Sequence, residues 1–113
     1  MGKAENAVVK VCRETVAAYG GVVVRVQAGV IPIGEGAARR FMRGATPGAA
    51  DLIGTFEGRA LAIECKAGRG KQSPLQAEWQ AGWERAGGVY VLARGAGEVI
   101  EALGAIRRGS NGN

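Results

Sequence analysis

Three charged side chains near the middle of the sequence have the types and spacing for hydrolytic chemistry. Glu64 and Lys66 are separated by one residue, Cys65, at the end of an apolar segment. Residues i and i+2 of a β-strand point to the same face, so we expect this carboxylate and this ammonium group side by side. A second acid, Asp51, precedes Glu64 by thirteen residues.

The two segments that contain these charges are predicted to form a β-hairpin. Residues 50–56 and 59–66 alternate in polarity and flank Glu57-Gly58, where glycine accepts the positive φ of a tight turn. A two-residue turn fixes the register, and this register places Asp51 opposite Glu64. Opposed side chains have Cβ atoms about 4.5–5.5 Å apart. The sequence therefore predicts two carboxylates and Lys66 on one face.

Two carboxylates at this separation favour a cation between them. Like charges destabilise a strand pair, and Lys66 supplies part of the neutralising charge. A divalent ion such as Mg²⁺ supplies more, because it binds one or two carboxylates and fills its other positions with water. Such an ion polarises a phosphoryl oxygen, and Lys66 is placed to orient the attacking water. The simpler alternative is a weak, solvent-exposed ion pair between Glu64 and Lys66.

Basic residues are concentrated near these acids. The loop from Ala67 to Gln72 is glycine-rich and leads into the start of a helix, where backbone N–H groups attract anions. We expect five bases of this loop and of the preceding glycine-rich segment to bind phosphates of a nucleic acid: Arg39, Arg40, Arg43, Arg69 and Lys71. The alternative is a solvated basic loop.

Composition restricts the class of protein and of chemistry. The chain has 113 residues, of which 47% are hydrophobic, which is enough for one compact domain. Its net charge of +5 favours a polyanionic partner, although many small proteins are basic without one. The absence of histidine excludes Ser/His and Cys/His catalysis and imidazole metal ligands. We find no apolar run long enough to span a membrane and no signal-peptide pattern, and so expect a cytoplasmic protein.

Periodicity predicts a single α/β domain over residues 1–113 with a central mixed sheet flanked by helices. The expected elements are a helix at 4–19, a strand at 22–27, short flap strands at 31–33 and 38–43, the hairpin, a helix from Ser73 to Ala86, a strand at 89–93 and a helix at 96–103. Residues 104–113 are expected to form a flexible tail. Ser73-Pro74-Leu75-Gln76 has the pattern of a capping box.

Two helices are assigned buried stripes from the same periodicity. For the first helix the stripe comprises Ala4, Ala7, Val8, Val11, Cys12, Thr15, Ala18 and Tyr19, and for the second it comprises Leu75, Trp79, Trp83 and Ala86.

These residues together resemble the PD-(D/E)XK nuclease superfamily and, more closely, the stand-alone VRR-NUC (virus-type replication-repair nuclease) domains of phages and bacteria. The matching residues are Asp51, the tripeptide Glu64-Cys65-Lys66, and Ser73 to Gln76. The order of elements, α-β-(flap)-β-β-α-β-α, agrees with a PD-(D/E)XK core over about residues 5–103. Ala50 stands where the family often has proline.

The resemblance implies a Mg²⁺- or Mn²⁺-dependent endodeoxyribonuclease. Its implied metal ligands are Asp51, Glu64 and the backbone carbonyl of Cys65, with Glu5 on the first helix assisting. Lys66 is the implied catalytic lysine, and Gln76 matches a glutamine of the family's active site. Glu5 is explained equally well as a first-turn carboxylate favoured by the helix dipole. The capping box alone would also explain Gln76.

The resemblance further implies a homodimer that cuts branched DNA, such as flaps or four-way (Holliday) junctions, in DNA repair or recombination. Two parts of the protein are candidate dimer interfaces: the flap segment, from Val30 to Arg43, and the last helix. Two alternative hypotheses are a non-catalytic nucleic-acid-binding module, and a nuclease of the same superfamily with a restriction-type or RNA substrate.

Overall fold

The central element of the fold is a four-stranded mixed sheet. The computed structural model describes residues 2–26, 30–38, 40–43 and 46–112. The strand order is β1-β4-β5-β6, in which the first three are antiparallel neighbours and β6 runs parallel to β5. The strands are β1 (Val22–Arg25), β4 (Leu52–Phe56), β5 (Arg59–Cys65) and β6 (Val89–Ala93). The predicted α/β class with a mixed sheet flanked by helices is confirmed.

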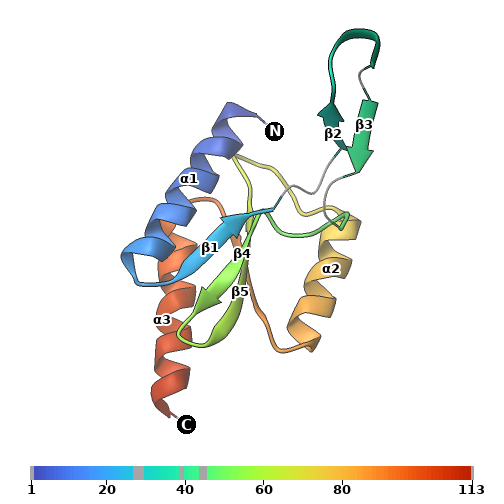
Figure 1. The fold of residues 1–113 in the computed structure, drawn as a ribbon. Helices are drawn as coiled ribbons and strands as arrows, with labels where there is room; N and C mark the ends of the chain where they lie inside the picture. The colour runs from blue at the N-terminus through green and yellow to red at the C-terminus, as the bar shows by residue number, and fades with distance from the viewer. Residues whose placement is uncertain (1, 27–29, 39, 44–45, 113) are drawn as a thin grey trace.

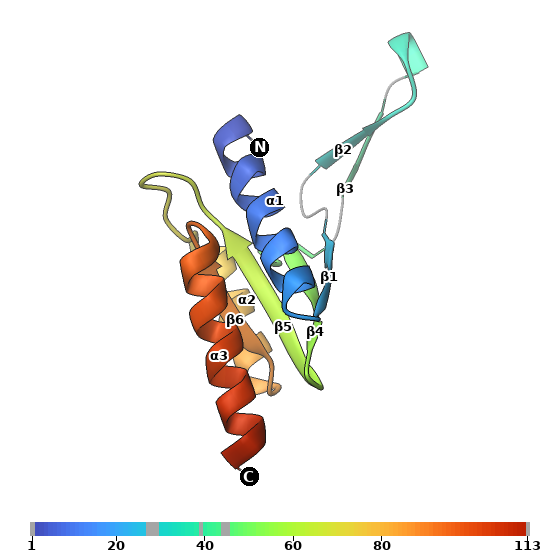
Figure 2. The same ribbon diagram turned by 90° about the vertical axis from the view of Figure 1, so that its left-hand side faces the viewer.

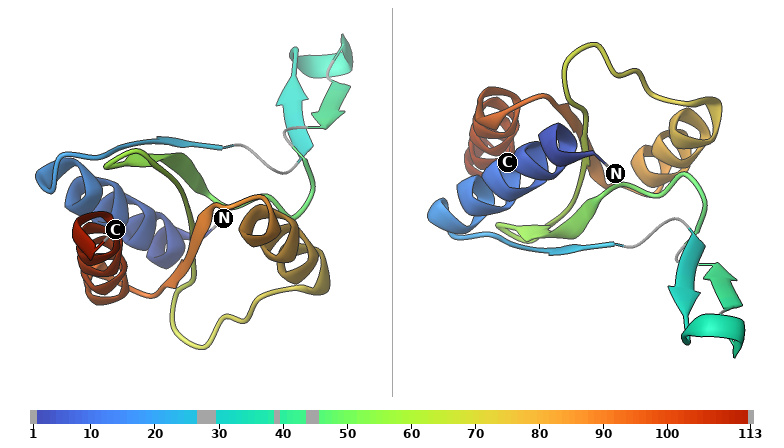
Figure 3. Two further views of the ribbon diagram at one scale, coloured as in Figure 1. Left: turned by 90° about the horizontal axis from the view of Figure 1, so that it is seen from below. Right: turned by 90° about the horizontal axis from the view of Figure 1, so that it is seen from above.

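The helices form layers on both faces of this sheet. In Figure 1 and the left view of Figure 3, α1 (Lys3–Ala18) and α3 (Ala96–Gly112) pack side by side on one face, and α2 (Pro74–Arg85) lies on the other. None of the helices in the described part of the chain combines the length and hydrophobicity needed to span a bilayer.

The hairpin of β4 and β5 has the predicted register. Phe56 pairs with Arg59 and Leu52 with Ile63, so the connecting turn is Glu57-Gly58. Both turn residues have positive φ, 48° and 80°, as a type I′ hairpin turn requires. The predicted pairing is therefore confirmed along the whole of β4, and Asp51 lies directly before its first residue.

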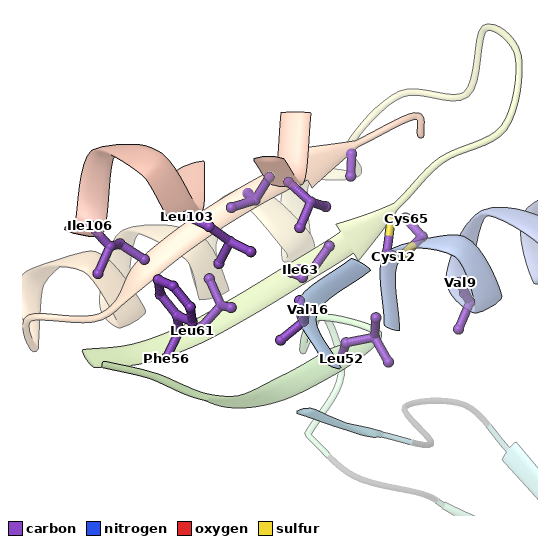
Figure 4. Packing of buried hydrophobic residues seen from close by; sticks show 13 residues of the cluster. Val9, Cys12, Val16, Leu52, Phe56, Leu61, Ile63, Cys65, Leu103 and Ile106 are labelled. Carbon is purple, nitrogen blue, oxygen red and sulfur yellow. The ribbon is translucent and has the colours of Figure 1, made fainter. Parts of the chain in front are cut away.

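The hydrophobic core fills the space between the sheet and the α1–α3 layer (Figure 4). β4 contributes Leu52 and Phe56, and β5 contributes Leu61, Ile63 and Cys65, all of them at most 1% exposed. Because neighbouring strand residues alternate between faces, Ala62 and Glu64 of β5 point to the opposite side, where α2 lies.

The buried face of α1 differs from the predicted stripe. Its buried residues are Val9, Cys12 and Val16, while Val11 and Tyr19 are 41% and 39% exposed. Apolar residues at 7, 8, 9, 11 and 12 support two overlapping stripes, and contact with α3 and the sheet selects the one centred on Cys12.

The predicted buried stripe of α2 is wrong. No residue of α2 is buried, and Leu75 is 56% exposed. Among the sheet strands, α2 packs mainly on β6. Trp79 and Trp83 stack with ring centroids 5.0 Å apart, and Trp83 Nε1 donates to the Val89 carbonyl at 2.9 Å. A ring contact between Trp79 and Tyr90 of β6, with centroids 6.2 Å apart, and hydrogen bonds such as that of Trp83 therefore hold this helix, and its apolar face stays partly exposed.

The last helix is longer than predicted. It continues past residue 103 to Gly112, so that residues 104–112 are helical and not an irregular tail. The reason is a continuous apolar stripe: Val99, Leu103 and Ile106 recur at helical spacing and are at most 5% exposed.

The predicted flap is a separate two-stranded ribbon. β2 (Val30–Ile33) pairs antiparallel with β3 (Arg40–Arg43), and a short 3₁₀ helix, η1 (Gly36–Ala38), lies between them. This ribbon projects away from the sheet and helices (Figures 1 and 2). The predicted short strands are thus confirmed.

Candidate active site

Three charged side chains are buried where β4 begins and β5 ends. Glu64 is the penultimate residue of β5, Lys66 follows that strand, and Asp51 precedes β4. Their exposed fractions are 2%, 9% and 9%, and they are the only buried polar or charged residues in the described ranges. The hairpin register brings them together, as the sequence predicted.

Direct contacts join these side chains. Lys66 Nζ lies 3.2 Å from Glu64 Oε2, and the two side chains are only 11% and 3% exposed. Asp51 Oδ2 accepts a buried hydrogen bond from the backbone N–H of Cys65 at 2.8 Å. Asp51 therefore reaches across to the β5 backbone between the other two charges. The alternative of a weak, solvent-exposed ion pair is wrong, because this pair is buried.

Glu64 is held in an environment that opposes its ionisation. Removal from water raises its pKa to about 7, the negative charge of Asp51 adds to the rise, and Lys66 opposes it. Glu64 Oε1 is also buried without a hydrogen-bond partner among the described residues. A buried acceptor of this kind carries a free-energy penalty unless a donor or a cation satisfies it.

The donor chemistry of this group fits Mg²⁺ or Mn²⁺. Two carboxylates and a nearby backbone carbonyl offer hard oxygen ligands, and Mg²⁺ characteristically binds to one or two carboxylates while keeping several waters. The described residues contain no cluster of three or more acidic or cysteine side chains arranged to bind a metal. With only two carboxylates as side-chain ligands, an ion bound here would take its remaining ligands from backbone carbonyls and water.

Cys65 borders the site through its backbone alone. Its side chain is fully buried in the core beside Cys12 (Figure 4). The neighbouring Cys12 thiol and burial both raise the pKa of the Cys65 thiol, which therefore stays protonated at neutral pH. A role for Cys65 as a metal ligand can involve only its carbonyl oxygen.

Gln76 both caps α2 and contacts the acidic pair. Its Oε1 accepts from Ser73 N at 2.8 Å, and its own N–H donates to Ser73 Oγ at 3.2 Å, which completes the predicted capping box. Its Nε2 donates to Glu64 Oε2 at 3.0 Å. The capping explanation of Gln76 is therefore confirmed, and its contact with Glu64 is compatible with the active-site role, which stays a prediction.

Glu5 lies in the first turn of α1, outside the acidic group. It is partly buried and stands four and seven residues before Val9 and Cys12, on the packed face of the helix. The described residues do not unite Glu5 with Asp51 and Glu64 in one cluster that could hold a metal. Its role as an assisting ligand stays a prediction.

The predicted DNA-binding bases fall into two places. Arg69 and Lys71 are exposed in the loop that starts directly after Lys66, where Gly70 N–H donates to the Ala67 carbonyl at 3.0 Å. Arg40 and Arg43 form the two ends of β3 on the projecting ribbon. Arg39 lies outside the described residues.

The structure adds residues that the sequence analysis missed. Gln72 Nε2 donates to Gln80 Oε1 at 2.7 Å and to Tyr90 Oη at 3.1 Å, which ties the end of the basic loop to α2 and β6. Arg94 Nη1 donates to the Gly68 carbonyl at 2.9 Å from the other side of the loop. The parallel pairing of 89–93 with 59–66 was the available signal for Arg94, because it aligns the carboxyl ends of the two strands.

Comparison with known proteins adds no family assignment. No protein-family model matches the chain, and no curated protein matches its sequence. The resemblance to VRR-NUC domains therefore depends on the site residues and the order of elements.

Proposed function

We propose that the protein is a divalent-metal-dependent endodeoxyribonuclease of the VRR-NUC type, with a PD-(D/E)XK core. The observation that supports this best is the environment of Glu64. Its buried carboxylate has one oxygen without a partner among the described residues, lies close to Asp51 and is 3.2 Å from Lys66 Nζ. This arrangement suits a divalent cation and a phosphodiester.

Each side chain has a distinct role in this proposal. Asp51, Glu64 and the Cys65 carbonyl would hold Mg²⁺ or Mn²⁺. When bound, the ion supplies Lewis-acid polarisation of a phosphoryl oxygen and lowers the pKa of a water molecule. Lys66 keeps its ammonium group against Glu64 Oε2, where it orients the attacking water and offsets the charge that develops on the phosphate. Gln76 fixes the orientation of Glu64.

The proposed substrate is branched DNA, either a flap or a four-way junction. The net charge of +5 and the exposed Arg69 and Lys71 beside the acidic group support a polyanionic substrate. The proposal includes a cytoplasmic location, in a bacterium or in a phage-infected cell.

A homodimer is part of the same proposal, because a two-fold dimer presents two sites to a two-fold junction. Exposed apolar side chains outside the core support an interface. Val22 and Val24 of β1 are 66% and 61% exposed, and Leu75 of α2 is 56% exposed.

A cleavage assay tests the proposed function. Labelled linear, flap and four-way DNA, and a labelled RNA of the same sequence, are incubated with the protein in Mg²⁺, in Mn²⁺ and in EDTA. We expect nicking of a branched substrate that requires the metal, and a Lys66→Ala variant that binds the same DNA but cuts it at least about a hundredfold more slowly. Absence of metal-dependent cleavage on every DNA and RNA tested, with binding retained, would support the non-catalytic alternative instead.

A further inference from the structure

Arg94 stands next to the proposed catalytic lysine because of the sheet topology. β6 pairs parallel with β5, with Cys65 opposite Ala93, so both strands end at the same edge of the sheet. Lys66 and Arg94 are the residues that follow these two ends, and Lys66 N–H donates to the Ala93 carbonyl at 3.0 Å. Ligands of α/β sheets bind outside the carboxyl ends of parallel strands. This position therefore exposes Arg94 to whatever approaches Lys66.

The guanidinium of Arg94 has further N–H donors that are available to bind an anion. Its Nη1 donates to the Gly68 carbonyl at 2.9 Å, and no acidic side chain among the described residues forms an ion pair with it. The residue is exposed. A guanidinium presents five N–H donors, and its planar fork matches two phosphate oxygens at once. The Gly68 carbonyl is neutral, so this contact does not neutralise the guanidinium, and the contact of Arg94 with an acidic side chain, Glu98 Oε1 at 3.4 Å, is made by its backbone N–H.

The same contact fixes one side of the basic loop. Gly68 lies near the start of the loop, and Gln72, at its end, is bound to Gln80 and Tyr90. Arg69 and Lys71 lie between these two anchored points. A loop held in place before binding loses less conformational entropy when it meets its ligand. Arg94 is thus in a position to act on two levels, by its own charge and by holding the loop.

We propose that Arg94 binds a phosphate of the DNA substrate and, through Gly68, positions the loop that carries Arg69 and Lys71. This inference rests on the proposed function, since it names a substrate contact of the same site. In this proposal Lys66 acts at the reacting phosphate, whereas Arg94 and the basic loop bind neighbouring phosphates of the DNA backbone.

The salt dependence of DNA binding tests the phosphate contact. A labelled four-way junction is titrated with protein in EDTA, so that no cleavage occurs, at several salt concentrations. Each lost phosphate contact lowers the slope of log K against log salt by about one. We expect Arg94→Ala to lower the slope by about one and to weaken binding about tenfold at 0.1 M salt. Arg94→Lys restores the slope but not the full affinity, because an ammonium group cannot form the bidentate contact.

A matched control and a double-mutant cycle separate the two roles. Arg13→Ala removes an exposed arginine from α1, on the other face of the sheet, and should leave the slope unchanged. If Arg94 positions the loop, Arg69→Ala weakens binding less in the Arg94→Ala background than in the wild type. Additive effects of these two substitutions would overturn the positioning role.

The outcomes also separate this inference from the nuclease proposal. An Arg94→Ala slope equal to that of the wild type, or a protein that does not bind the junction at all, overturns the assignment of Arg94. If the Arg94→Ala slope equals that of the wild type but metal-dependent cleavage is observed and is lost in Lys66→Ala, the nuclease proposal still stands. The expected change in slope without cleavage of any substrate would support Arg94 and contradict the nuclease.

Discussion

The side-chain amide of Gln76 donates to Glu64 Oε2 at 3.0 Å, and so ties the first turn of α2 to the end of β5. The same carboxylate oxygen lies 3.2 Å from Lys66 Nζ. Both donors therefore hold Oε2, while Oε1 is left without a partner among the described residues. The capping box fixes the amide in turn, because Gln76 Oε1 accepts from Ser73 N. The start of α2 thus fixes the orientation of the Glu64 carboxylate.

Two substitutions separate the capping role of this turn from its role in the site. Ser73→Ala removes the cap acceptor but leaves the contact between Gln76 and Glu64, so we expect a loss of about 1 kcal/mol in the free energy of unfolding and cleavage within a few-fold of wild type. Gln76→Ala removes both contacts and should lower the cleavage rate at least tenfold as well. Urea unfolding and single-turnover cleavage measure the two effects. Equal cleavage by both variants would assign Gln76 to capping alone.

Removal of Lys66 should affect chemistry and not binding. The Lys66 ammonium is buried against Glu64, so it is expected to act on the reacting phosphate and to contribute little to the grip on DNA. We expect Lys66→Ala to cut about 10²–10³-fold more slowly, the usual loss for one electrostatic group of an active site. Lys71→Ala, which removes an exposed base of the loop, should weaken binding and leave the single-turnover rate at saturation unchanged. Cleavage by Lys66→Ala at the wild-type rate would contradict the assigned mechanism.

The local sequence was sufficient to predict the geometry of the acidic pair. Glu57-Gly58 specifies a two-residue turn, and a turn of this length fixes the register for the whole hairpin. Asp51 and Glu64 follow from that register. The capping box was equally local, since Ser73 and Gln76 are three residues apart. These features are determined by neighbours in the chain, and so the sequence alone revealed them.

The features that were predicted wrongly or missed depend on tertiary contacts and not on neighbours in the chain. Periodicity allowed two stripes on α1, and only packing against α3 chose the one centred on Cys12. The exposure of Leu75 depends on how little of the sheet α2 covers. Arg94 was missed because its guanidinium reaches the basic loop through a tertiary contact with the Gly68 carbonyl, 26 residues away.

The raised pKa of Glu64 predicts a pH dependence of stability in the metal-free protein. The folded-state pKa is about 7 and the ordinary value is 4.5, because burial and Asp51 oppose the charge. Between these values the folded state keeps a proton that the unfolded state has lost, so the free energy of unfolding falls as the pH rises from about 4.5 to about 7. Above pH 7 the penalty is constant at about 3 kcal/mol.

Glu64→Gln should remove this penalty. We expect the variant to be more stable than the wild type at pH 8 in EDTA and to differ little from it at pH 4.5, as measured by urea unfolding. Glu101→Gln, which changes an exposed glutamate of α3, provides the control and should follow the wild-type profile. A constant difference between Glu64→Gln and the wild type from pH 4.5 to pH 8 would show that Glu64 titrates normally.

Metal binding should depend on the acidic pair and much less on Glu5. Asp51→Asn removes a negative charge beside Glu64, and we expect it to abolish the heat of Mg²⁺ binding in calorimetry. Glu5 is not grouped with the pair, so Glu5→Gln should keep the Mg²⁺ affinity within about threefold of wild type. Because a protonated Glu64 must lose its proton to bind a cation, the wild-type affinity should rise with pH up to about 7. A loss of affinity in Glu5→Gln equal to that in Asp51→Asn would make Glu5 a full ligand.

Gly48 packs closely against the start of α2, and a substitution there tests how precisely the first turn of α2 must position Glu64. Gly48 has φ +85°, and a Cβ there would meet the Leu75 carbonyl and lie 3.2 Å from Gln76 N. Gly48→Ala must therefore strain the lead-in to Asp51 or push the first turn of α2 away from Glu64. We expect a loss of about 1–3 kcal/mol in stability and at least a tenfold slower cleavage, since small displacements of positioning residues are costly. Gly97→Ala, at a position on α3 where a Cβ meets nothing within 4 Å, should preserve both properties. If Gly48→Ala loses stability while its single-turnover rate is unchanged, the contact between Gln76 and Glu64 is not what positions the carboxylate.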